Sequence, residues 1–404
     1  MINYMFLFFF KVCLSYVCSM LNEETTALCA LNKIYGFTPV TGHAVVDAFG
    51  AAAPAFRASR EELIKKVGAY RGVGDQLFPE LLESARSELE TLARLWSGTC
   101  TFVPWGDINY PSLLAQCADA PLGLYVRSER PLEEIFDDTP NVAIVGTRDV
   151  SPYGRHWCRE IVKGLSACRI RPRIVSGLAI GTDICAHICA MECGLPTIAV
   201  LPTGIDDVYP FVHSRRAMEI ASAPGSALIS DYPLRSAPAK INFLRRNRII
   251  AGLSGATIVV ESKSKGGSLI TAQLSFDYDR DVYALPGRID DLRSKGCNSL
   301  IRLQTARPFE TVEALCSMLG LGVGRRRKAD LLYALEQRYC DADPTWVGLA
   351  KAAASLIKAR RAISVEDVSR EMCLSYSETV ALLGILESDG FIVTDLLQRC
   401  SIVI

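Results

Sequence analysis

The sequence predicts an α/β fold, namely a doubly wound, mostly parallel sheet with helices on both faces. Short apolar runs of the kind that form buried strands recur from residue 141 to residue 284, and helical segments separate most of them. This alternation is typical of a parallel sheet that is covered on both sides. The predicted strands are Val142–Val145, Ile174–Ser176, Thr197–Leu201, Ala227–Ser230, Thr257–Val260 and Asp281–Ala284, with a further short strand ending at Val126.

A small helical domain is predicted before the sheet, over residues 20–98. Its short apolar-periodic runs are broken by glycines, and Ser59 followed by Glu62 has the pattern that begins a helix. We expect a bundle of the SAM or helix-hairpin-helix kind. Such bundles can bind nucleic-acid backbone, but a structural role is favoured here. The main α/β domain is then predicted over residues 99–320.

A winged-helix domain is predicted over residues 345–404, after a basic linker at 321–344 that contains Arg325–Lys328. Helical patterns, two of them opening at Ser364 and Ser375, precede a short hairpin. The helix that follows Ser375 carries Glu378 and Glu387 but no lysine or arginine. Such a helix is poorly suited to a phosphate-lined groove, so we expect it to pack or to contact protein.

The charge balance argues against a globally basic nucleic-acid-binding protein, because 44 Lys and Arg are matched by 44 Asp and Glu in 404 residues. Any nucleic-acid site must therefore be a local patch. The 15 cysteines include no C-x-x-C pair, which indicates a reduced, cytoplasmic protein without a disulfide or zinc framework. The cysteines around His187 recur every fourth residue, as on a packed helix face, so no metal is expected.

Residues 1–19 are interpreted as an apolar extension that results from a mis-assigned start, with the functional protein beginning at Met20. The run Met5–Phe10 is too short to span a membrane, and Lys11 follows this run where a signal peptide has its basic residue first. No membrane association is expected. A peptide from residues 1–19 in the purified native protein would contradict this interpretation.

The turns that follow the predicted strands are suited to phosphate. Ligands bind a parallel sheet beyond the carboxyl ends of its strands. Nearly all of the turns there are rich in glycine, hydroxyl groups or positive charge, which together provide backbone N–H groups and cations. These turns are Gly146–Arg148, Gly177–Asp183, Pro202–Asp206, Asp231–Pro233 with the basic stretch after it, and Lys263–Ser268.

The densest positive charge lies in the stretch 232–260, which has five basic residues and no acid. Arg245, Arg246 and Arg248 fall within one helical turn and so cannot share one face. We expect them to ring the start of a helix, which favours phosphate, with Phe243 just before that start and ready to stack on a base. A solvated basic turn, paired with acids elsewhere, is the alternative.

The standard nucleotide fingerprints are absent. No G-x-G-x-x-G follows the first strand, and the chain has no G-x-x-x-x-G-K-[ST] motif. This disfavours a dinucleotide enzyme or an NTPase, and no nucleophile set is evident. We therefore expect no cofactor and no catalytic residues.

Several motifs occur in a fixed order between about Tyr110 and Ala306. They are Val142–Arg148 with Ser151, Tyr153 and Gly154; Ser176–Ala179 through Gly181, Asp183, Ala186 and His187; Gly204–Asp206 with Tyr209 and Pro210; Phe243–Ser254; Gly267–Ala272; Ala284–Gly287; and Gly296–Ile301. In this order they resemble the DNA processing protein A family (DprA, also called Smf). The departures are His213 for a usual asparagine, Asp231 for a usual glutamate, Gly267 for a usual serine and a missing glycine before Ala306. None of them removes a basic or aromatic residue from these turns.

The resemblance implies an extended Rossmann domain that binds single-stranded DNA without catalysing a reaction. It also implies a homodimer that helps to load the RecA recombinase on incoming DNA in natural transformation. Basic side chains would neutralise phosphates, and Phe243 would stack on a base. For Asn247 and Arg248, bracing of the site with Glu261 as a partner is weighed equally with direct contact. The expected DNA-binding residues are Arg148, Ser176, Gly177, Lys240, Phe243, Arg245, Arg246, Asn247, Arg248, Lys265, Gly266, Gly267, Ser268 and Thr271.

A Rossmann-fold hydrolase of a small nucleotide, similar to the phosphoribohydrolases, is the alternative function. Those enzymes use a P-G-G-x-G-T-x-x-E signature, whereas the loop Lys265–Gln273 has no glutamate in the helical turn that follows. Hydrolysis needs an acid or base within hydrogen-bond reach, and Asp183, Asp206 and Glu261 stay candidates for that role. A purely structural adaptor would leave the acid-free basic stretch without a purpose.

Overall fold

The computed structural model describes residues 22–68, 77, 79–95, 99–322, 331–340, 342–360, 363–395 and 398–402. The chain divides into two compact units, Met1–Val323 and Gly324–Ile404. The predicted extension at 1–19 and the arginine run of the predicted linker lie outside the described residues. Among the residues that are described, none of the helices combines the length and the apolar character of a membrane span.

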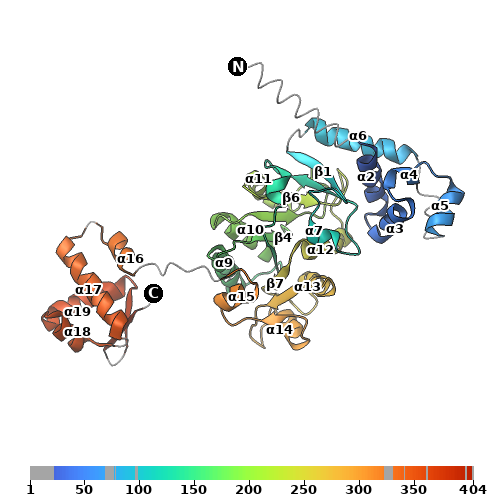
Figure 1. The fold of residues 1–404 in the computed structure, drawn as a ribbon. Helices are drawn as coiled ribbons and strands as arrows, with labels where there is room; N and C mark the ends of the chain where they lie inside the picture. The colour runs from blue at the N-terminus through green and yellow to red at the C-terminus, as the bar shows by residue number, and fades with distance from the viewer. Residues whose placement is uncertain are drawn as a thin grey trace, which may run out of the picture. The chain divides into compact units, whose positions relative to one another are not determined.

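A large, mostly parallel sheet forms the centre of the first unit and confirms the predicted α/β class (Figure 1). Within the described residues its strand order is β1-β2-β6-β5-β4-β3-β7-β8-β9. Strands β1 and β2 pair antiparallel, β2 also pairs antiparallel with β6, and the strands from β6 to β9 in this order are parallel. The bounds are β1 Cys100–Pro104, β2 Gly123–Arg127, β3 Asn141–Val145, β4 Arg173–Ser176, β5 Thr197–Val200, β6 Ala227–Ser230, β7 Ala256–Val259, β8 Asp281–Ala284 and β9 Arg307–Pro308.

All seven predicted strands form, but β1 and β9 are additional. Strand β9 has only two residues, an arginine and a proline, so it shows no apolar pattern of its own. Strand β1 is a short run that ends at Pro104, and its partner β2 lies about twenty residues away. Both strands exist because a neighbouring strand offers free backbone groups, which a local pattern does not reveal.

Helices cover both faces of the sheet, because successive side chains of a strand point to opposite faces. In β3, Val142 and Ile144 pack with residues of α9 and α10, whereas Ala143 and Val145 pack with residues of α12 and α13. Figure 1 shows the strands between these two pairs of helices. The bounds on the first face are α9 Pro152–Ser166, α10 Thr182–Glu192, α11 Ser214–Ser222 and α15 Val312–Met318. Those on the second face are α7 Ser112–Ala115, α12 Lys240–Leu253, α13 Gly267–Asp277 and α14 Lys295–Arg302.

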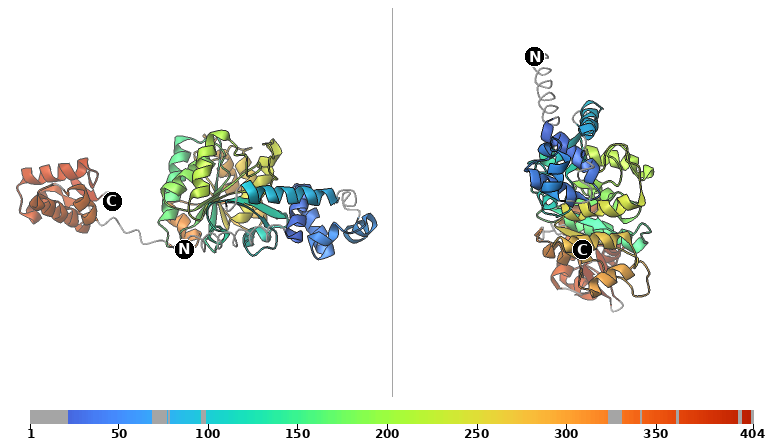
Figure 2. Two further views of the ribbon diagram at one scale, coloured as in Figure 1. Left: turned by 90° about the horizontal axis from the view of Figure 1, so that it is seen from above. Right: turned by 90° about the vertical axis from the view of Figure 1, so that its right-hand side faces the viewer.

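The predicted helices before the sheet are present, but they belong to the same compact unit as the sheet. The left view of Figure 2 shows α6 running from the sheet toward the other helices of this group. Ser59 caps α5 as predicted, since its Oγ accepts a hydrogen bond from Glu62 N at 3.2 Å. The SAM or helix-hairpin-helix assignment stays a prediction. The bounds are α2 Glu23–Tyr35, α3 Pro39–Phe49, α4 Ala52–Ala55, α5 Arg60–Val67 and α6 Pro79–Leu95.

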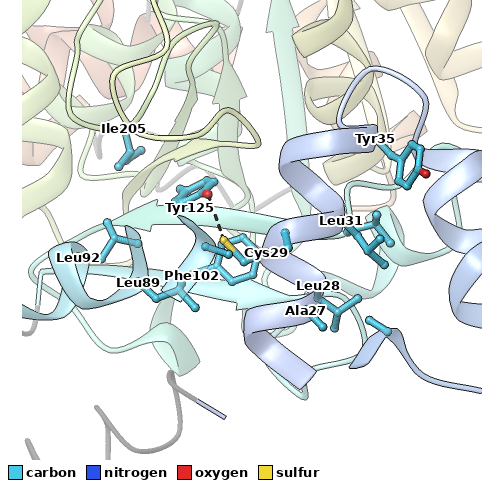
Figure 3. Close-up of a cluster of buried hydrophobic side chains, with 14 of the residues drawn as sticks. Ala27, Leu28, Cys29, Leu31, Tyr35, Leu89, Leu92, Phe102, Tyr125 and Ile205 are labelled. Atoms are coloured by element: carbon cyan, nitrogen blue, oxygen red, sulfur yellow. Dashed lines mark hydrogen bonds between the residues drawn. The ribbon is translucent and has the colours of Figure 1, made fainter. Parts of the chain in front are cut away.

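These helices share a hydrophobic core with the sheet (Figure 3). Leu31 of α2 and Leu89 of α6 lie in one buried cluster with Phe102 of β1 and Tyr125 of β2. The Tyr125 hydroxyl lies 3.5 Å from Cys29 Sγ. A shared core of this kind explains why the helices and the sheet form one compact unit.

Polar contacts also tie the helices to the segment just before α12. The Lys33 ammonium pairs with Glu88 at 2.5 Å, and Glu88 Oε1 accepts a hydrogen bond from Leu234 N at 2.8 Å. Asn32 Nδ2 donates to the carbonyl of Asp231 at 2.8 Å. The N-terminal helices therefore help to position the start of the basic stretch.

The second unit contains four helices and a small antiparallel sheet within its described residues. Ser364 and Ser375 cap helices as predicted, and Ser375 forms a complete capping box with Glu378. Leu335 of α16, which falls inside the predicted linker, is buried in the core of this unit. The winged-helix assignment stays a prediction. The bounds are α16 Leu331–Arg338, α17 Pro344–Arg360, α18 Val365–Met372, α19 Tyr376–Ser388, β10 Ile363–Ser364, β11 Ile392–Thr394 and β12 Arg399–Ile402.

Candidate functional site

The direction in which successive strands are added to the sheet reverses at β3, although the strands on both sides of β3 are parallel to it. From β3 the chain moves outward through β4, β5 and β6, and α12 then carries it back to β7 on the other side of β3. The loops after β3 and β7 therefore leave the sheet on opposite sides, which opens a crevice at its carboxyl edge. The topology thus places this crevice where the sequence has its glycine-rich and basic turns.

A pocket of about 250 Å³ lies at this edge. Its walls come from the loops after β3, β4 and β7, from the start of α10, from α12 and from the first turns of α13. Four basic side chains and a single carboxylate are among the lining residues, so the pocket is strongly positive although the whole chain is neutral. The lining residues are Val145, Gly146, Thr147, Arg148, Ala179, Asp183, Phe243, Leu244, Arg246, Asn247, Ile250, Lys263, Lys265, Gly266, Gly267, Ser268 and Thr271.

Arg246 is the most unusual side chain of the pocket. It is only 3% exposed, yet its Nε and Nη1 have no hydrogen-bond partner in the described structure. Burial lowers the pKa of Arg246 to about 10, so the guanidinium group stays charged at neutral pH. A buried cation with unused donors is costly for the fold. A ligand with acceptor oxygens would satisfy these donors.

Glycine at position 177 gives the Arg246 guanidinium its space. A Cβ atom on Gly177 would lie 1.5 Å from Arg246 Nη1, so every larger residue would displace the arginine. Gly177 follows β4 directly, which explains why the turn after this strand begins with glycine. Asp183, at the start of α10, faces the same group. Burial raises the pKa of Asp183 above its ordinary value, while the positive charge of Arg246 acts in the opposite direction.

Arg148 and Phe243 form a cation–π pair at the mouth of the pocket. Arg148 is exposed on the loop after β3, and its Cζ atom lies 5.0 Å from the centroid of the Phe243 ring. This distance is within the range of a cation–π contact. The Phe243 ring is half-buried and also meets Tyr209 edge-on at 5.5 Å. A guanidinium group and an aromatic ring thus stand side by side at the entrance.

The first turn of α13 provides backbone donors on another wall of the pocket. Gly266 is the N-cap residue, and Gly267 and Ser268 are the first residues of this 11-residue helix. The N–H groups of a first helical turn have no partner within the helix and carry a partial positive charge. Lys263 and Lys265 precede them, and Lys263 is held by Asp149 at 3.2 Å. This wall has the composition of an anion site.

Asn247 and Thr271 complete the predicted residues that line the pocket. Asn247 Nδ2 donates to the carbonyl of Gly267 at 3.3 Å and so links α12 to the start of α13. Thr271 is buried one turn into α13. The structure therefore brings together nine of the predicted residues: Arg148, Phe243, Arg246, Asn247, Lys265, Gly266, Gly267, Ser268 and Thr271.

The predicted start of the basic helix is wrong. Helix α12 begins at Lys240, so Phe243 lies inside its first turn and the three arginines lie in its second and third turns. The N-cap residue is Ala239, which makes no side-chain capping bond. Helix starts are recognised in a sequence by residues whose side chains can cap the first turn. Alanine has no such group, so nothing in the sequence signals a start at Lys240.

The three arginines separate as their spacing predicts, but only Arg246 lines the pocket. Arg245 donates to the carbonyl of Phe37 at 3.0 Å and lies over the ring of the same residue, 4.1 Å from its centroid. Arg248 pairs with Asp231 at 2.5 Å and donates to the carbonyl of Asp119. Arg248 therefore braces the fold, and the expected brace to Glu261 is wrong. Glu261 instead accepts hydrogen bonds from the backbone and hydroxyl of Ser151.

Three further predicted residues lie outside the lining of the pocket. The Ser176 hydroxyl is buried and donates to the carbonyl of Ile144 at 2.6 Å. Gly177 lies behind Arg246, as described above. Lys240 is exposed at the first position of α12. Conversely, Lys263 and Asp183 line the pocket although neither is among the predicted DNA-binding residues.

No group of three or more potential metal ligands occurs among the described residues. His187 is buried, with Nδ1 2.8 Å from the hydroxyl of Thr197. Cys189 of the same helix is packed in the core with Cys158 of α9.

The chain is similar to several known proteins. A family model described as DNA recombination-mediator protein A matches residues 101–320. Protein Smf of Synechocystis sp. is 34% identical over 284 residues, which cover 70% of this chain and 69% of that protein. DNA processing protein DprA of Streptococcus pneumoniae is 39% identical over 196 residues, which cover 48% of this chain and 66% of that protein. The chain thus spans about two thirds of the length of these relatives.

A solved structure shares the fold. The X-ray structure of DNA processing protein A (DprA) from Streptococcus pneumoniae matches with a TM-score of 0.58 and 29% identity, covering 71% of this chain and 95% of that one. The match of the family model spans more than half of the chain. The chain therefore belongs to the DNA recombination-mediator protein A family.

Proposed function

We propose that this chain is a single-stranded DNA-binding protein that holds the strand in the pocket at the carboxyl edge of its sheet. One observation carries the proposal. Arg148, Arg246 and the lysines before α13 converge with a helix N-terminus and the Phe243 ring in one pocket. The cations and amides would neutralise phosphates, and the ring would stack on a base. We propose that Asn247, Gly266, Gly267, Ser268 and Thr271 contact the same strand.

A single strand fits this site better than a duplex. Phe243 lies partly inside a concave pocket, so a base must leave a stack of paired bases to meet the ring. A duplex would instead favour a protruding basic helix that enters a groove. In the second unit, α19 carries Glu378 and Glu387 and no basic residue, which favours packing or protein contact for this helix.

The wider role that we propose follows from membership of the family. We propose that the chain is a cytoplasmic homodimer that helps to load the RecA recombinase on incoming DNA in natural transformation. The family model is described as a DNA recombination-mediator protein, and this description supports the proposed role. The free cysteines of the described residues fit a reducing compartment.

We propose no catalytic role for the candidate carboxylates. Asp206 accepts hydrogen bonds from the backbone N–H of Arg235, and Glu261 is engaged by Ser151. Asp183 is the one carboxylate among the lining residues described. Hydrolysis of a small nucleotide, the alternative function, would therefore depend on Asp183.

Fluorescence anisotropy with labelled single-stranded and duplex oligonucleotides at two salt concentrations tests the proposal. The variant Arg148→Ala/Lys265→Ala removes two pocket cations that are exposed. The variant Arg302→Ala/Lys358→Ala removes two exposed cations outside the pocket. We expect the wild type to prefer single strands and the pocket variant to lose affinity and salt dependence, since each phosphate contact adds to the salt slope. The control variant should change little.

Two results would contradict the proposal. Equal loss in both variants would mean that the pocket has no special role. If the wild type binds no oligonucleotide, but cleaves a nucleoside monophosphate and loses this activity in Asp183→Asn, the alternative function is correct.

A further inference from the structure

Beside the pocket, the segment Tyr209–Val212 exposes an unusual amount of apolar surface. Tyr209 is 41% exposed, Phe211 is 86% exposed and Val212 is 72% exposed. Single exposed apolar residues are common, but neighbouring ones next to a charged pocket indicate a binding surface. We call Tyr209 and Phe211 the aromatic strip.

The segment is held in place by its own hydrogen bonds. His213 is buried, and its Nδ1 lies 2.8 Å from the carbonyl of Leu178 in the loop after β4. The backbone N–H of His213 donates to the carbonyl of Pro210 at 2.9 Å, and the Ser214 hydroxyl donates to that of Phe211 at 2.7 Å. These contacts hold the backbone carbonyls of Pro210 and Phe211 in place while the Phe211 side chain stays in solvent. The aromatic strip is therefore pre-organised, which lowers the entropic cost of binding.

The aromatic strip is continuous with the pocket. The Tyr209 and Phe243 rings lie 5.5 Å apart with an angle of 73° between their planes. Phe243 also meets the guanidinium group of Arg148. Contacts thus link Arg148, Phe243 and Tyr209, and the exposed Phe211 follows Tyr209 two residues later in the chain.

A cation lies close to the Phe243 end of the strip. Lys240 lies one helical turn before Phe243 on α12, so both residues are on one face, and Lys240 is exposed. Asp206, which precedes the strip in the sequence, is engaged by the backbone N–H of Arg235. The exposed rings therefore suit bases, and Lys240 suits a phosphate of the same strand.

We infer that single-stranded DNA leaves the pocket across Phe243 and stacks further bases on Tyr209 and Phe211, with Lys240 beside the phosphate that links them. This inference rests on the proposed function and extends its site by about one or two nucleotides. It also gives a role to Lys240, which the pocket leaves outside its lining. Stacking on aromatic rings tolerates any base, as a sequence-independent mediator requires.

Binding of labelled oligo-dT of 3, 6, 12 and 20 nucleotides tests the inference on the full chain. The test variant is Tyr209→Ala/Phe211→Ala. The matched control is Phe276→Ala, since Phe276 is an exposed aromatic residue near the far end of α13. We expect the test variant to bind the 3-mer like the wild type and to bind the 12-mer about five- to a hundredfold more weakly. Its salt slope should be unchanged, because no phosphate contact is removed.

A second measurement reports stacking directly. Strands with 5-iododeoxyuridine at single positions should crosslink to Tyr209 or Phe211 on irradiation, and mass spectrometry should identify the residue. We expect crosslinks at nucleotides adjacent to the one that the pocket protects. In the Lys240→Ala variant, the slope of log affinity against log salt concentration should fall by about the contribution of one phosphate contact.

The outcomes separate this inference from the proposed function. If Arg148→Ala abolishes binding while the aromatic-strip variant binds all lengths like the wild type, the strip inference is wrong and the function stands. If the wild type binds no oligonucleotide, the function itself fails. If Tyr209→Ala/Phe211→Ala has wild-type DNA affinity but a different oligomeric mass in light scattering, the strip is a contact between protein chains. That result would overturn the inference.

Discussion

Two buried arginines of one helix, only two positions apart, have opposite surroundings. Arg248 is 7% exposed and is bound by the Asp231 carboxylate and the Asp119 carbonyl. Arg246 is 3% exposed, lines the pocket, and has two guanidinium nitrogens that find no hydrogen-bond partner among the described residues. The ion-pair site around Arg248 and the pocket around Arg246 therefore use the same chemical group for different purposes.

The difference shows how burial and partners together distinguish structure from function. A buried ion pair with its hydrogen bonds satisfied holds the fold, and loss of one partner leaves an uncompensated charge. A buried cation whose hydrogen-bond donors are not all satisfied costs stability and is tolerated where a ligand provides the missing acceptors. The following predictions test this comparison, in order of decreasing effect.

The largest expected effect is on stability, in Arg248→Met. This variant keeps the side-chain volume but leaves the buried Asp231 carboxylate without its cation. We expect the free energy of unfolding to fall by about 3–5 kcal/mol, as measured by chemical denaturation. Variants that remain folded should bind DNA like the wild type. An unchanged midpoint would mean that the ion pair does not brace the fold.

The stability loss of Arg248→Met should depend on pH. Burial raises the pKa of Asp231 above its ordinary value, and Arg248 opposes this shift. Without the arginine the pKa should rise further. A carboxyl group whose folded pKa is raised favours the fold in its protonated form, and this contribution is lost as pH rises through the folded pKa. The deficit relative to wild type should therefore be larger at pH 7 than near pH 4, and an equal deficit at both values would contradict the assignment.

The next effect is on affinity, in Arg246→Met. We expect single-stranded DNA to bind at least about 2 kcal/mol more weakly, because a desolvated charge contact is lost. The loss in the free energy of unfolding should be smaller than in Arg248→Met, because two donors of Arg246 are unsatisfied within the described residues, although the variant also removes the positive charge that faces the buried Asp183. Anisotropy and denaturation of the same preparation measure both quantities. A stability loss as large as that of Arg248→Met would show that Arg246 is also a structural brace.

A smaller loss of affinity is expected for Phe243→Ala. Removal of a stacking ring should cost about 1–3 kcal/mol of binding free energy. Phe243→Trp keeps a stacking surface and should retain most of the affinity, whereas Phe243→Leu keeps only apolar volume. The salt slope should be the same in all three variants. If Phe243→Leu binds DNA with wild-type affinity, Phe243 contributes by apolar packing and not by stacking on a base.

The smallest effect is expected for Arg245→Ala. Its guanidinium group contacts the Phe37 ring and carbonyl at a partly exposed site, so we expect a stability loss of about 0.5–1 kcal/mol. Because Arg245 does not line the pocket, DNA affinity should change by less than about twofold, which corresponds to about 0.4 kcal/mol of binding free energy. A double-mutant cycle with Phe37→Ala should show that the two losses are not additive. Strong loss of affinity would place Arg245 on the DNA.

Features that depend only on residues close together in the sequence could be predicted from it. The buried strands were identified by short apolar runs, because both faces of the sheet are covered. Ser59 and Ser375 marked helix starts, since a capping side chain bonds to an amide a few residues away. The start of α12 was misplaced because Ala239 gives no such signal.

Local sequence patterns were enough to predict the α/β class, the sheet edge that carries the glycine-rich and basic turns, and the residue types of the pocket. The separate roles of the three arginines could not be predicted in this way, because they depend on tertiary packing. The partners of these arginines are remote in the chain: Arg245 meets Phe37 across 208 residues, Arg248 meets Asp119 across 129, and Arg246 occupies the space left by Gly177. Three side chains within four positions of a helix point in different directions, and the environment in each direction is set by the packing of distant segments.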